Sequence, residues 1–304
     1  MDKVMSMKEA IGKFVKSGDT LFLSGMQHGE PSAAIHEIVR QKIDHLKLIN
    51  ALVTTYSLLI GEGLTDKVYT GWMFQDIKRS YAMGKAKKLG RLPVIEEYSH
   101  FALNLALLAG QMGVPYIPAK CTLGSDFLKV NPNIKETACP FTGQNLAAIR
   151  ALVPDIGIIH VQRSDADGNA QKWGSLGMDV EGINASRKVI VTTEKIVDSD
   201  VIRRDPNRTI IPGFRVSAVV EQPWGAHPMQ LAGFYGDDQF GFYAEVGAPE
   251  RYEEYVRRLV YGVKDWTEYL KVRREIKGDT YFKKLEMNPI ASDPIFTGVE
   301  KVQL

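Results

Sequence analysis

The chain has 304 residues, of which 44% are hydrophobic and 24% are charged, and its formal net charge is +2. These values are typical of a globular protein with a substantial core, and they exclude a disordered or collagen-like chain. The near balance of 38 basic and 36 acidic residues gives no reason to expect a nucleic acid as partner. Two cysteines, Cys121 and Cys139, are too few for a zinc motif or a disulfide framework, which favours a reducing compartment.

The sequence shows no signal for export or for membrane insertion. Its first nine residues contain no apolar core of signal-peptide length, and no window reaches 18 uninterrupted apolar residues. We therefore expect a soluble protein of the cytoplasm that has no membrane partner.

The first 53 residues predict two parallel strands joined by a helix. Ser6 and Glu9 fit a capping box at the start of the first helix. Pro31 suits the first turn of the next helix, because its missing N–H group is not needed there. The expected elements are a helix that ends near Lys16, a strand over 20–23, a helix over 32–41 and a strand over 46–53. Strand, helix and strand with short links predict a parallel sheet.

The same alternation continues along the chain. Ser99 can cap a long apolar helix over 101–112, and apolar residues at helical spacing predict a helix over 249–276. Further strands are expected at 68–69, 93–97, 156–161, 188–193 and 216–220. The predicted fold class is α/β, with an open, mainly parallel sheet flanked by helices. We expect a single domain over residues 1–304, with residues 249–276 as a helical C-terminal extension.

Common nucleotide and metal motifs are absent. The segment Gly61-Glu62-Gly63 lacks the third glycine of a dinucleotide fingerprint, and there is no phosphate-loop lysine motif. The six histidines show no metal-ligand spacing, and no Gly-x-Ser-x-Gly elbow occurs. From these observations alone, the expectation is an α/β domain that binds a small ligand near the carboxyl ends of its strands.

Four segments in order along the chain resemble the α subunit of class I coenzyme A transferases, most closely the glutaconate CoA-transferase type. The first is the entry strand and glycine loop that begin at Ser17-Gly18-Asp19, and the last reads Pro-Trp-Gly-Ala-His-Pro. The segments are 17–26, 113–118 with 123–126, 160–169 and 223–228. Their order and spacing agree with the family over nearly the whole chain.

The resemblance implies a reaction, a substrate and a partner. A carboxylate attacks an acyl-CoA thioester, the enzyme forms a glutamyl-CoA thioester, and the CoA then passes to a second acid. The coenzyme A thioester is thus a substrate, and no permanently bound cofactor is expected. In two-subunit members the nucleophilic glutamate lies on the β subunit in a Ser-Glu-Asn-Gly-like motif, and no Glu-Asn-Gly occurs in this chain. We therefore expect a β-subunit partner in a heterotetramer or larger assembly, and a chain that is inactive alone.

The resemblance also implies that two glycine loops bind the substrate and CoA. The residues concerned are Ser24, Gly25, Met26 and Gln27 after the first strand, and Gly124 and Ser125 further along. Their backbone N–H groups and hydroxyls are suited to stabilise developing oxyanions. The alternative for each loop is an ordinary turn without a ligand.

Two catalytic candidates come from a related group of enzymes. Ring-opening CoA hydrolases that resemble this family use a glutamate of the α-type chain near the position of His100, and Glu97 lies close by in the sequence. A histidine can act as a general base because its ordinary pKa is near neutrality. The alternative is that His100 caps a helix or faces solvent.

The first glycine loop departs from the family pattern at its basic position. The family usually has Arg or Lys before the proline, whereas this chain has Glu30 before Pro31. Without that cation a second substrate carboxylate would be costly to bury, and Glu30 would repel it. We therefore predict an acyl group other than glutaconate, facing an apolar wall of Met26, Trp72, Met73 and Phe74.

Other motif residues have simpler structural interpretations. His160 is expected to be a hydrogen-bonded core histidine, and residues 167–169 a turn between strands. His227 is expected to be structural or to lie at the subunit interface. The basic run from Lys78 to Arg91 is expected to be a solvated surface, and the alternative is that it attracts the CoA phosphates or the partner subunit.

Two other functions remain open beside the transferase. One is a CoA-thioester hydrolase or an acyl-CoA decarboxylase on the same heteromeric fold. The other is a non-catalytic ligand sensor, for which support is lacking because no helix-turn-helix precedes the first strand.

Overall fold

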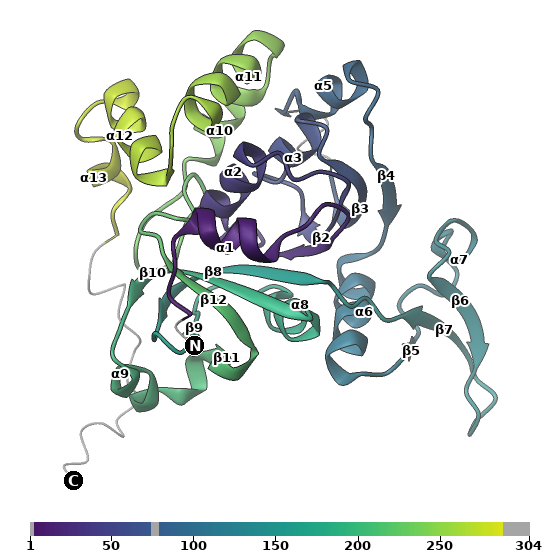
Figure 1. Ribbon diagram of the computed structural model, residues 1–304. Helices are drawn as coiled ribbons and strands as arrows, with labels where there is room; N and C mark the ends of the chain where they lie inside the picture. Colours follow the sequence, from purple (N-terminus) through teal and green to yellow (C-terminus); the bar gives the residue numbers. More distant parts are fainter. Residues whose placement is uncertain (1–2, 74–78, 288–304) are drawn as a thin grey trace.

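The computed structural model describes residues 3–73 and 79–287, and a nine-stranded sheet lies at the centre of this part (Figure 1). Seven of its strands run parallel in the order β12–β10–β8–β1–β2–β3–β4. Their bounds are β1 Thr20–Leu23, β2 Leu46–Leu52, β3 Thr65–Trp72, β4 Val94–Glu97, β8 Ile156–Ser164, β10 Lys188–Ile196 and β12 Val216–Glu221. Two short strands, β9 (Ala170–Gln171) and β11 (Thr209–Ile211), add antiparallel pairs at the end of β8.

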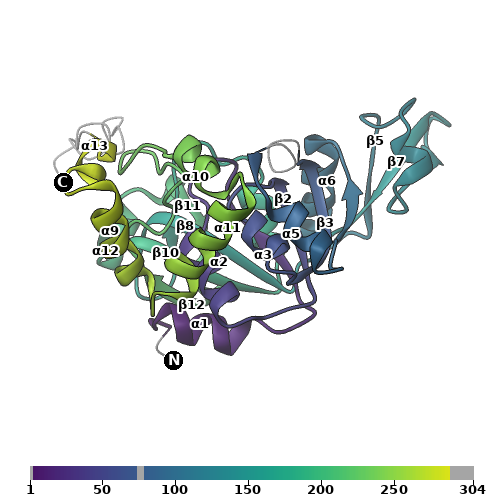
Figure 2. The same cartoon turned by 90° about the horizontal axis from the view of Figure 1, so that it is seen from above.

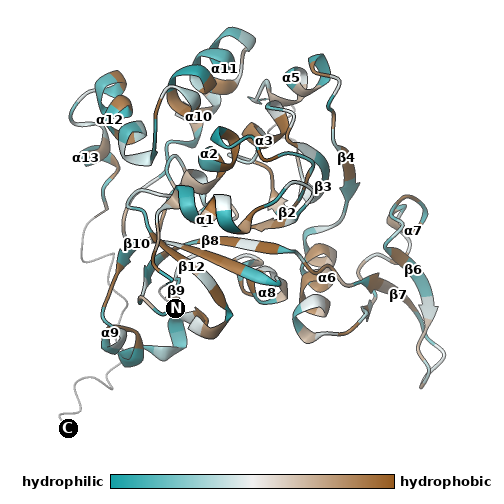
Figure 3. Ribbon diagram, in the orientation of Figure 1, coloured by the Kyte–Doolittle hydropathy of each residue, from teal (hydrophilic) through white to brown (hydrophobic). Residues whose placement is uncertain are grey.

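The central strands are buried on both faces, as parallel strands between helices are. Along β1, Leu21 and Leu23 pack into one core cluster, whereas Phe22 packs into the cluster on the opposite face. Helix α8 (Asp179–Ala185) approaches Phe22 closely at Gly182, where a Cβ atom would lie 2.2 Å from the phenyl ring. Figure 3 shows the hydrophobic residues gathered on the inner strands, with hydrophilic residues on outer helices such as α11 (Pro249–Tyr255).

Helices cover both faces of the sheet (Figures 1 and 2). One face carries α1 (Met7–Phe14), α2 (Ser32–Arg40), α3 (Ser57–Gly61) and α5 (Ala82–Lys88), and the other carries α6 (His100–Met112) and α8. Helix α9 (Ser199–Arg204) and the 3-10 turns Pro206–Arg208 and Gly213–Arg215 connect the last strands. The C-terminal region packs beside the first group as α10 (Gln239–Val246), α11, the π-helical turn Val256–Tyr261, α12 (Trp266–Lys277) and α13 (Tyr281–Leu285).

A small lobe projects from the sheet and was not anticipated from the sequence (Figures 1 and 2). It is an antiparallel sheet in the order β5 (Tyr116–Ala119), β7 (Asn145–Arg150) and β6 (Ile134–Ala138), with the short helix α7 (Phe127–Val130). Buried Ile134, Ala147 and Ile149 join it to the core cluster beneath α6. We refer to residues 116–150 as the lobe.

The predicted parallel α/β fold is confirmed, and most predicted elements begin or end within two residues of those observed. Ser6 and Glu9 form the predicted capping box, and Ser99 accepts a hydrogen bond from the amide of Ala102 at the start of α6. The segment over 249–276 is helical, as predicted, but it is not a single helix. It is interrupted after Tyr261, and a new helix begins where the Asp265 side chain accepts the amide of Glu268. Within the described residues, no helix has both the length and the apolar character required to cross a bilayer.

Candidate functional site

The carboxyl ends of β1 and β8 mark the point where the chain reverses its direction across the sheet. From β1 the chain runs outward through β2, β3 and β4, and from β8 it runs the other way through β10 and β12. Open α/β sheets bind ligands outside the carboxyl ends of the strands at such a point. The loop that follows β1, residues 24–30, lies there and contains four of the predicted site residues. We call it the β1 loop.

The β1 loop has a backbone that only a glycine-rich sequence adopts easily. It has positive φ at Gly25 (100°), Gln27 (61°) and Gly29 (63°). A Cβ atom at Gly25 would lie 2.7 Å from Cγ and 2.9 Å from Cα of Glu30, so a larger residue does not fit. The amide of Ser24 donates to Ile158 O at 3.0 Å, which fixes the start of the loop against β8. Met26 and Gln27 are the residues of the loop that remain half-buried rather than buried.

Glu30 lies beneath the β1 loop rather than on its surface. Its carboxylate is fully buried and accepts hydrogen bonds from the hydroxyls of Thr54 and Thr55, the latter at 2.7 Å, and from the Gln27 amide at 3.3 Å. Burial raises the pKa of Glu30 above its ordinary value, and these hydrogen bonds partly oppose the shift. The expectation that Glu30 faces and repels a substrate carboxylate is therefore wrong. The hydroxyls of the two threonines that follow β2 instead hydrogen-bond this carboxylate inside the protein.

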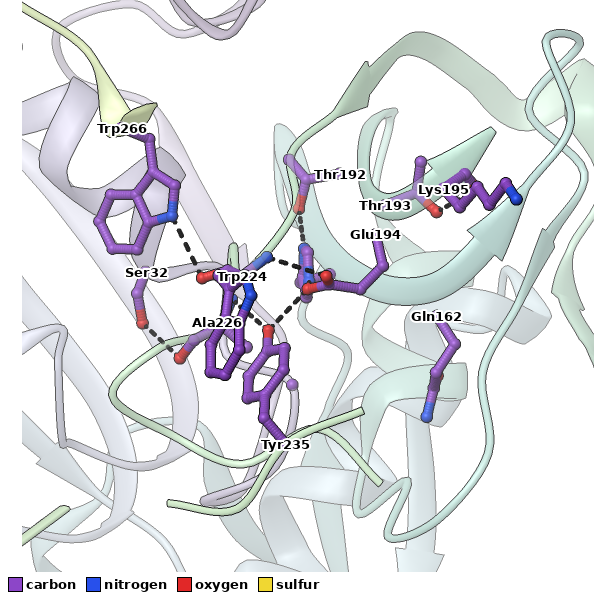
Figure 4. Close-up of polar contacts among 12 residues, drawn as sticks. Ser32, Gln162, Thr192, Thr193, Glu194, Lys195, Trp224, Ala226, Tyr235 and Trp266 are labelled. Carbon is purple, nitrogen blue, oxygen red and sulfur yellow. Dashed lines mark hydrogen bonds and ion pairs between the residues drawn. The ribbon is translucent and has the colours of Figure 1, made fainter. Parts of the chain in front are cut away.

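A second buried carboxylate lies on β10, on the other side of β8 from β1 (Figure 4). Glu194 on β10 accepts hydrogen bonds from His160 Nε2 at 2.8 Å, from the Tyr235 hydroxyl at 2.6 Å and from the Trp224 amide at 2.8 Å. His160 Nδ1 lies 2.9 Å from Thr192 Oγ1. Both ring nitrogens thus have hydrogen-bonding partners inside the protein, which confirms the prediction of a core histidine. The network ties the segment around residues 224–235 to the ends of β8 and β10.

His100 and Glu97 lie at the corner between β4 and α6. Glu97 is exposed at the end of β4. His100 begins α6 and packs so closely on Gly71 of β3 that a Cβ there would lie 2.1 Å from its Cδ2 atom. Its Nε2 atom is buried and, within the described part of the chain, has no hydrogen-bond partner. Two strands separate β4 from β1, so this corner is about 14 Å along the sheet from the β1 loop.

Gly124 and Ser125 lie in the lobe, between β5 and α7. Gly124 is exposed with φ 75°, and among the described residues no atom beyond its own chain neighbours lies within 4 Å of its Cβ position. The Ser125 hydroxyl donates to Thr122 O at 2.7 Å, as in an ordinary turn. The structure therefore brings the four residues of the β1 loop together, and it places the β4–α6 corner and this turn at two other positions.

The expected apolar wall is not formed as a unit. Met26 packs against the core cluster beneath α6, whereas Met73 belongs to the cluster on the opposite face of the sheet. Trp72 is 45% exposed, and Phe74 lies outside the described residues. In the basic run, Lys78 also lies outside them, and Lys85 forms ion pairs with Glu62 and Glu253 at 2.7 and 2.9 Å.

Several residues around the β1 loop were not found by sequence reasoning. Lys172 and Asp179 form a buried ion pair at 2.6 Å, and the Gly25 amide donates to Asp179 Oδ1 at 2.7 Å. These residues are 147 or more positions from Gly25 in the sequence, and no local pattern marks them. Glu194 is likewise far from the β1 loop in the sequence, and no local pattern marks it. In the residues that the structure describes, no group of three or more His, Cys, Asp or Glu side chains could hold a metal ion.

Comparison with known proteins identifies relatives over nearly the whole chain. A family model described as coenzyme A transferase matches residues 4–222. The chain is 35% identical over 280 residues to the A subunit of 3-oxoadipate CoA-transferase from Pseudomonas knackmussii, covering 88% of this chain and 97% of that protein. It is 33% identical over 294 residues to the A subunit of glutaconate CoA-transferase from Acidaminococcus fermentans, covering 89% and 91%. The crystal structure of the glutaconate enzyme from that organism superimposes with a TM-score of 0.85 at 30% identity, over 97% of this chain and 98% of the other.

Proposed function

This chain belongs to the coenzyme A transferase family as an α-subunit-type member, and we propose that it works together with a β subunit in a cytoplasmic CoA-transferase. The complex would move CoA between an acyl-CoA and a free carboxylic acid. Two relatives that share about a third of its residues are named as A subunits, which supports the need for a second type of subunit. We propose a heterotetramer or larger assembly, with the CoA thioester as substrate and no permanently bound cofactor.

The proposal that the partner supplies the nucleophile rests on one observation, which is that the carboxylates near the β1 loop are buried and hydrogen-bonded. A nucleophilic carboxylate must be accessible to the thioester carbonyl. Around the β1 loop, Glu30 is held by two threonines, Asp179 by Lys172, and Glu194 by a histidine and a tyrosine. All three are at most 8% exposed. This chain therefore supplies a shaped and hydrogen-bonded wall rather than the attacking group.

With the nucleophile on the β subunit, CoA transfer proceeds in two half-reactions. A glutamate of the β chain attacks the thioester carbonyl, releases the CoA thiolate and forms a mixed anhydride with the acyl group. The thiolate then attacks the glutamyl carbonyl, the first acid leaves, and the glutamyl-CoA thioester remains. The same steps in reverse pass CoA to the acceptor acid. The β1 loop lies at the carboxyl edge of the sheet, where its half-buried residues Met26 and Gln27 can face the reacting groups of these steps.

We further propose that the acyl group is a dicarboxylic one. The relatives named above carry the names of two dicarboxylic acids, 3-oxoadipate and glutaconate. Glu30 is buried and hydrogen-bonded to Thr54 and Thr55, so it does not line the loop surface. We propose that the cation for the second carboxylate, which this loop lacks, comes from the β chain. Comparing kcat/KM of the assembled complex on glutaryl-CoA and on butyryl-CoA tests this choice, and a preference for the monocarboxylic ester would contradict it.

The function is tested by producing the chain alone and together with a candidate β-type chain from the same organism. We expect CoA transfer to acetate or a dicarboxylate only from the complex. Incubation with acyl-CoA followed by borohydride should reduce a glutamyl thioester on the β chain and inactivate the enzyme. A labelled residue on this chain, or turnover by this chain alone, would contradict the proposal.

A second candidate is a CoA-thioester hydrolase, and the position of His100 favours it. Its buried Nε2 atom, which has no partner in the described structure, could accept a proton from water at the sheet edge. A hydrolase would release free CoA at the same rate with or without an acceptor acid, whereas a transferase requires the acceptor. The same assays therefore separate the two.

A further inference from the structure

The ion pair between Lys172 and Asp179 lies deep in the protein beside the β1 loop. Its N–O distance is 2.6 Å, and the two side chains are 0% and 2% exposed. Burying two charges carries a desolvation cost that their attraction often fails to repay, so such a pair is weak evidence for stability alone. A buried pair of this kind calls for a role in fixing one particular arrangement of the chain.

Both partners direct their remaining hydrogen bonds at the β1 loop. Asp179 Oδ1 accepts the Gly25 amide at 2.7 Å, at the start of the loop. Lys172 Nζ lies 3.4 Å from His28 O and 3.3 Å from Gly29 O, near the end of the loop. One ion pair therefore holds the loop at two points on either side of Met26 and Gln27. Hydrogen bonds to charged groups are stronger than neutral ones, which suits them to hold a strained backbone.

The backbone of the β1 loop is strained, so it needs stabilising contacts to keep its conformation. Three residues between Gly25 and Gly29 have positive φ, and one of them, Gln27, is not a glycine. The Gln27 amide is held from below by Glu30, and the Gly29 amide donates to Gln230 O at 2.8 Å. With the flanking amides engaged inside the protein, Met26 and Gln27 form the part of the loop that is left at the surface.

From this geometry we propose that Lys172 and Asp179 are positioning residues, which hold Met26 and Gln27 in the conformation that the reacting thioester meets. The proposal rests on the proposed transferase function. The pair touches no substrate and takes no proton in the reaction. It acts through the backbone of the β1 loop, so its loss should lower kcat far more than it raises KM. A displacement of about 1 Å at a reacting group can cost about 100-fold in rate.

The test uses the double variant Lys172→Met/Asp179→Asn in the complex with the β subunit. This variant leaves no unpaired charge, and the amide oxygen introduced at position 179 can still accept the Gly25 N–H, while the hold on His28 and Gly29 is lost. We expect kcat to fall about 100-fold with KM changed less than about threefold. Hydrogen exchange of residues 24–30 should become faster while the core strands stay protected.

The matched control is another ion pair with a fully buried cation, Arg273 with Glu245 in the C-terminal helical region. The variant Arg273→Met/Glu245→Gln should keep kcat within about threefold, because it lies away from the β1 loop. An equal loss of kcat in both double variants, or a full kcat for the Lys172→Met/Asp179→Asn complex, would overturn the proposal.

Two readouts keep the proposal testable if the variant does not fold or the proposed function fails. In the wild-type chain the Gly25 amide should exchange as slowly as those of β1 and β8, and fast exchange would contradict the hold by Asp179. If the wild-type complex transfers no CoA, the proposed function is wrong, whereas the exchange pattern still reports on the ion pair by itself.

Discussion

The β1 loop and the β4–α6 corner follow parallel strands of the same sheet, yet they are held in different ways. The β1 loop is fixed by residues from β8, from the segment after β2 and from the start of α8, all distant in sequence. The corner is held by its own cap, in which the Ala102 amide donates to Ser99 Oγ at 3.1 Å, and by backbone contacts at Tyr98 and Glu97. The Tyr98 amide donates to Thr70 O at 3.0 Å, and Asn131 Nδ2 donates to Glu97 O at 2.8 Å. The β1 loop thus gains a rigid shape, whereas the corner keeps a side-chain nitrogen, His100 Nε2, that has no partner among the described residues. Substitutions in the β1 loop should therefore lower activity and stability more than substitutions at the β4–α6 corner.

The largest effect is expected for Gly25→Ala. The new Cβ would collide with Glu30 and would sit on a backbone with φ 100°, so the loop must move. We expect kcat/KM of the complex to fall about 100-fold, because a loop displaced by about 1 Å no longer fits the reacting group. The unfolding free energy should fall by about 3 kcal/mol, measured by denaturant titration.

Gly124→Ala in the lobe is the matched control, since that glycine also has a positive φ but nothing near its Cβ position. Only the backbone preference is lost there, which costs about 1 kcal/mol. Equal losses of stability in the two variants would show that the crowding around Gly25 is not what restricts the loop.

The next effect is expected for Glu30→Ala. It removes the acceptor of the Thr54 and Thr55 hydroxyls, and of these two only Thr55 keeps another contact among the described residues, with Ser32 Oγ at 3.5 Å. Unpartnered buried groups of this kind cost about 1–3 kcal/mol each, so we expect a total loss of about 3 kcal/mol in unfolding free energy. Glu97→Ala at the exposed end of β4 should change the same quantity by less than about 0.5 kcal/mol. If the unfolding free energy of Glu30→Ala were unchanged, this would contradict the view that the Glu30 carboxylate stabilises the loop from beneath.

A smaller effect is expected from acid. His28 is buried and neutral, since Nδ1 contacts Ser175 O and Nε2 accepts the Ala232 amide, both at 2.9 Å. Burial, with the nearby Lys172 charge, lowers the pKa of His28 from 6.5 to about 4. The unfolded chain therefore binds more protons between these values, so stability falls as the pH falls from 6.5 towards 4. At pH 5 the loss attributable to His28 should be about 2 kcal/mol.

His28→Gln should flatten this part of the stability profile, which thermal unfolding between about pH 4 and 8 would measure. The buried Glu30 acts with the opposite sign, because its raised pKa favours the folded state at low pH and that stabilisation is lost as the pH rises. A profile unchanged by His28→Gln would contradict the assignment to this side chain.

The smallest effect is expected for His100→Gln at the corner. Its Nε2 atom has no hydrogen bond to lose in the described structure, so the unfolding free energy should change by less than about 1 kcal/mol. CoA transfer should fall by less than about tenfold if the partner supplies the nucleophile. A loss of about 100-fold, the size expected of a general base, would favour the hydrolase instead.

The lobe shows where sequence reasoning failed. Its strands β5, β6 and β7 are short, and their alternating burial is weak because much of the lobe is exposed. Without a long apolar run or a clear two-residue period, the segment resembles a loop. The parallel strands were predicted well for the opposite reason. β1, β8 and β10 are buried on both faces, so they appear as continuous apolar runs.

The family, the parallel α/β core and the position of the β1 loop could be predicted from the amino-acid sequence, because apolar runs, caps and glycine motifs are local patterns. The contacts that hold the β1 loop could not be predicted in this way and depend on the three-dimensional fold. The sheet order makes β8 the neighbour of β1 although some 130 residues separate them, and Asp179 and Lys172 then reach the loop from the chain beyond β8. The fold also explains why the Glu30 carboxylate is buried, since Thr54 and Thr55 at the adjacent strand end donate hydrogen bonds to it there. Such partners are set by strand pairing across the sheet, and no local pattern encodes that pairing.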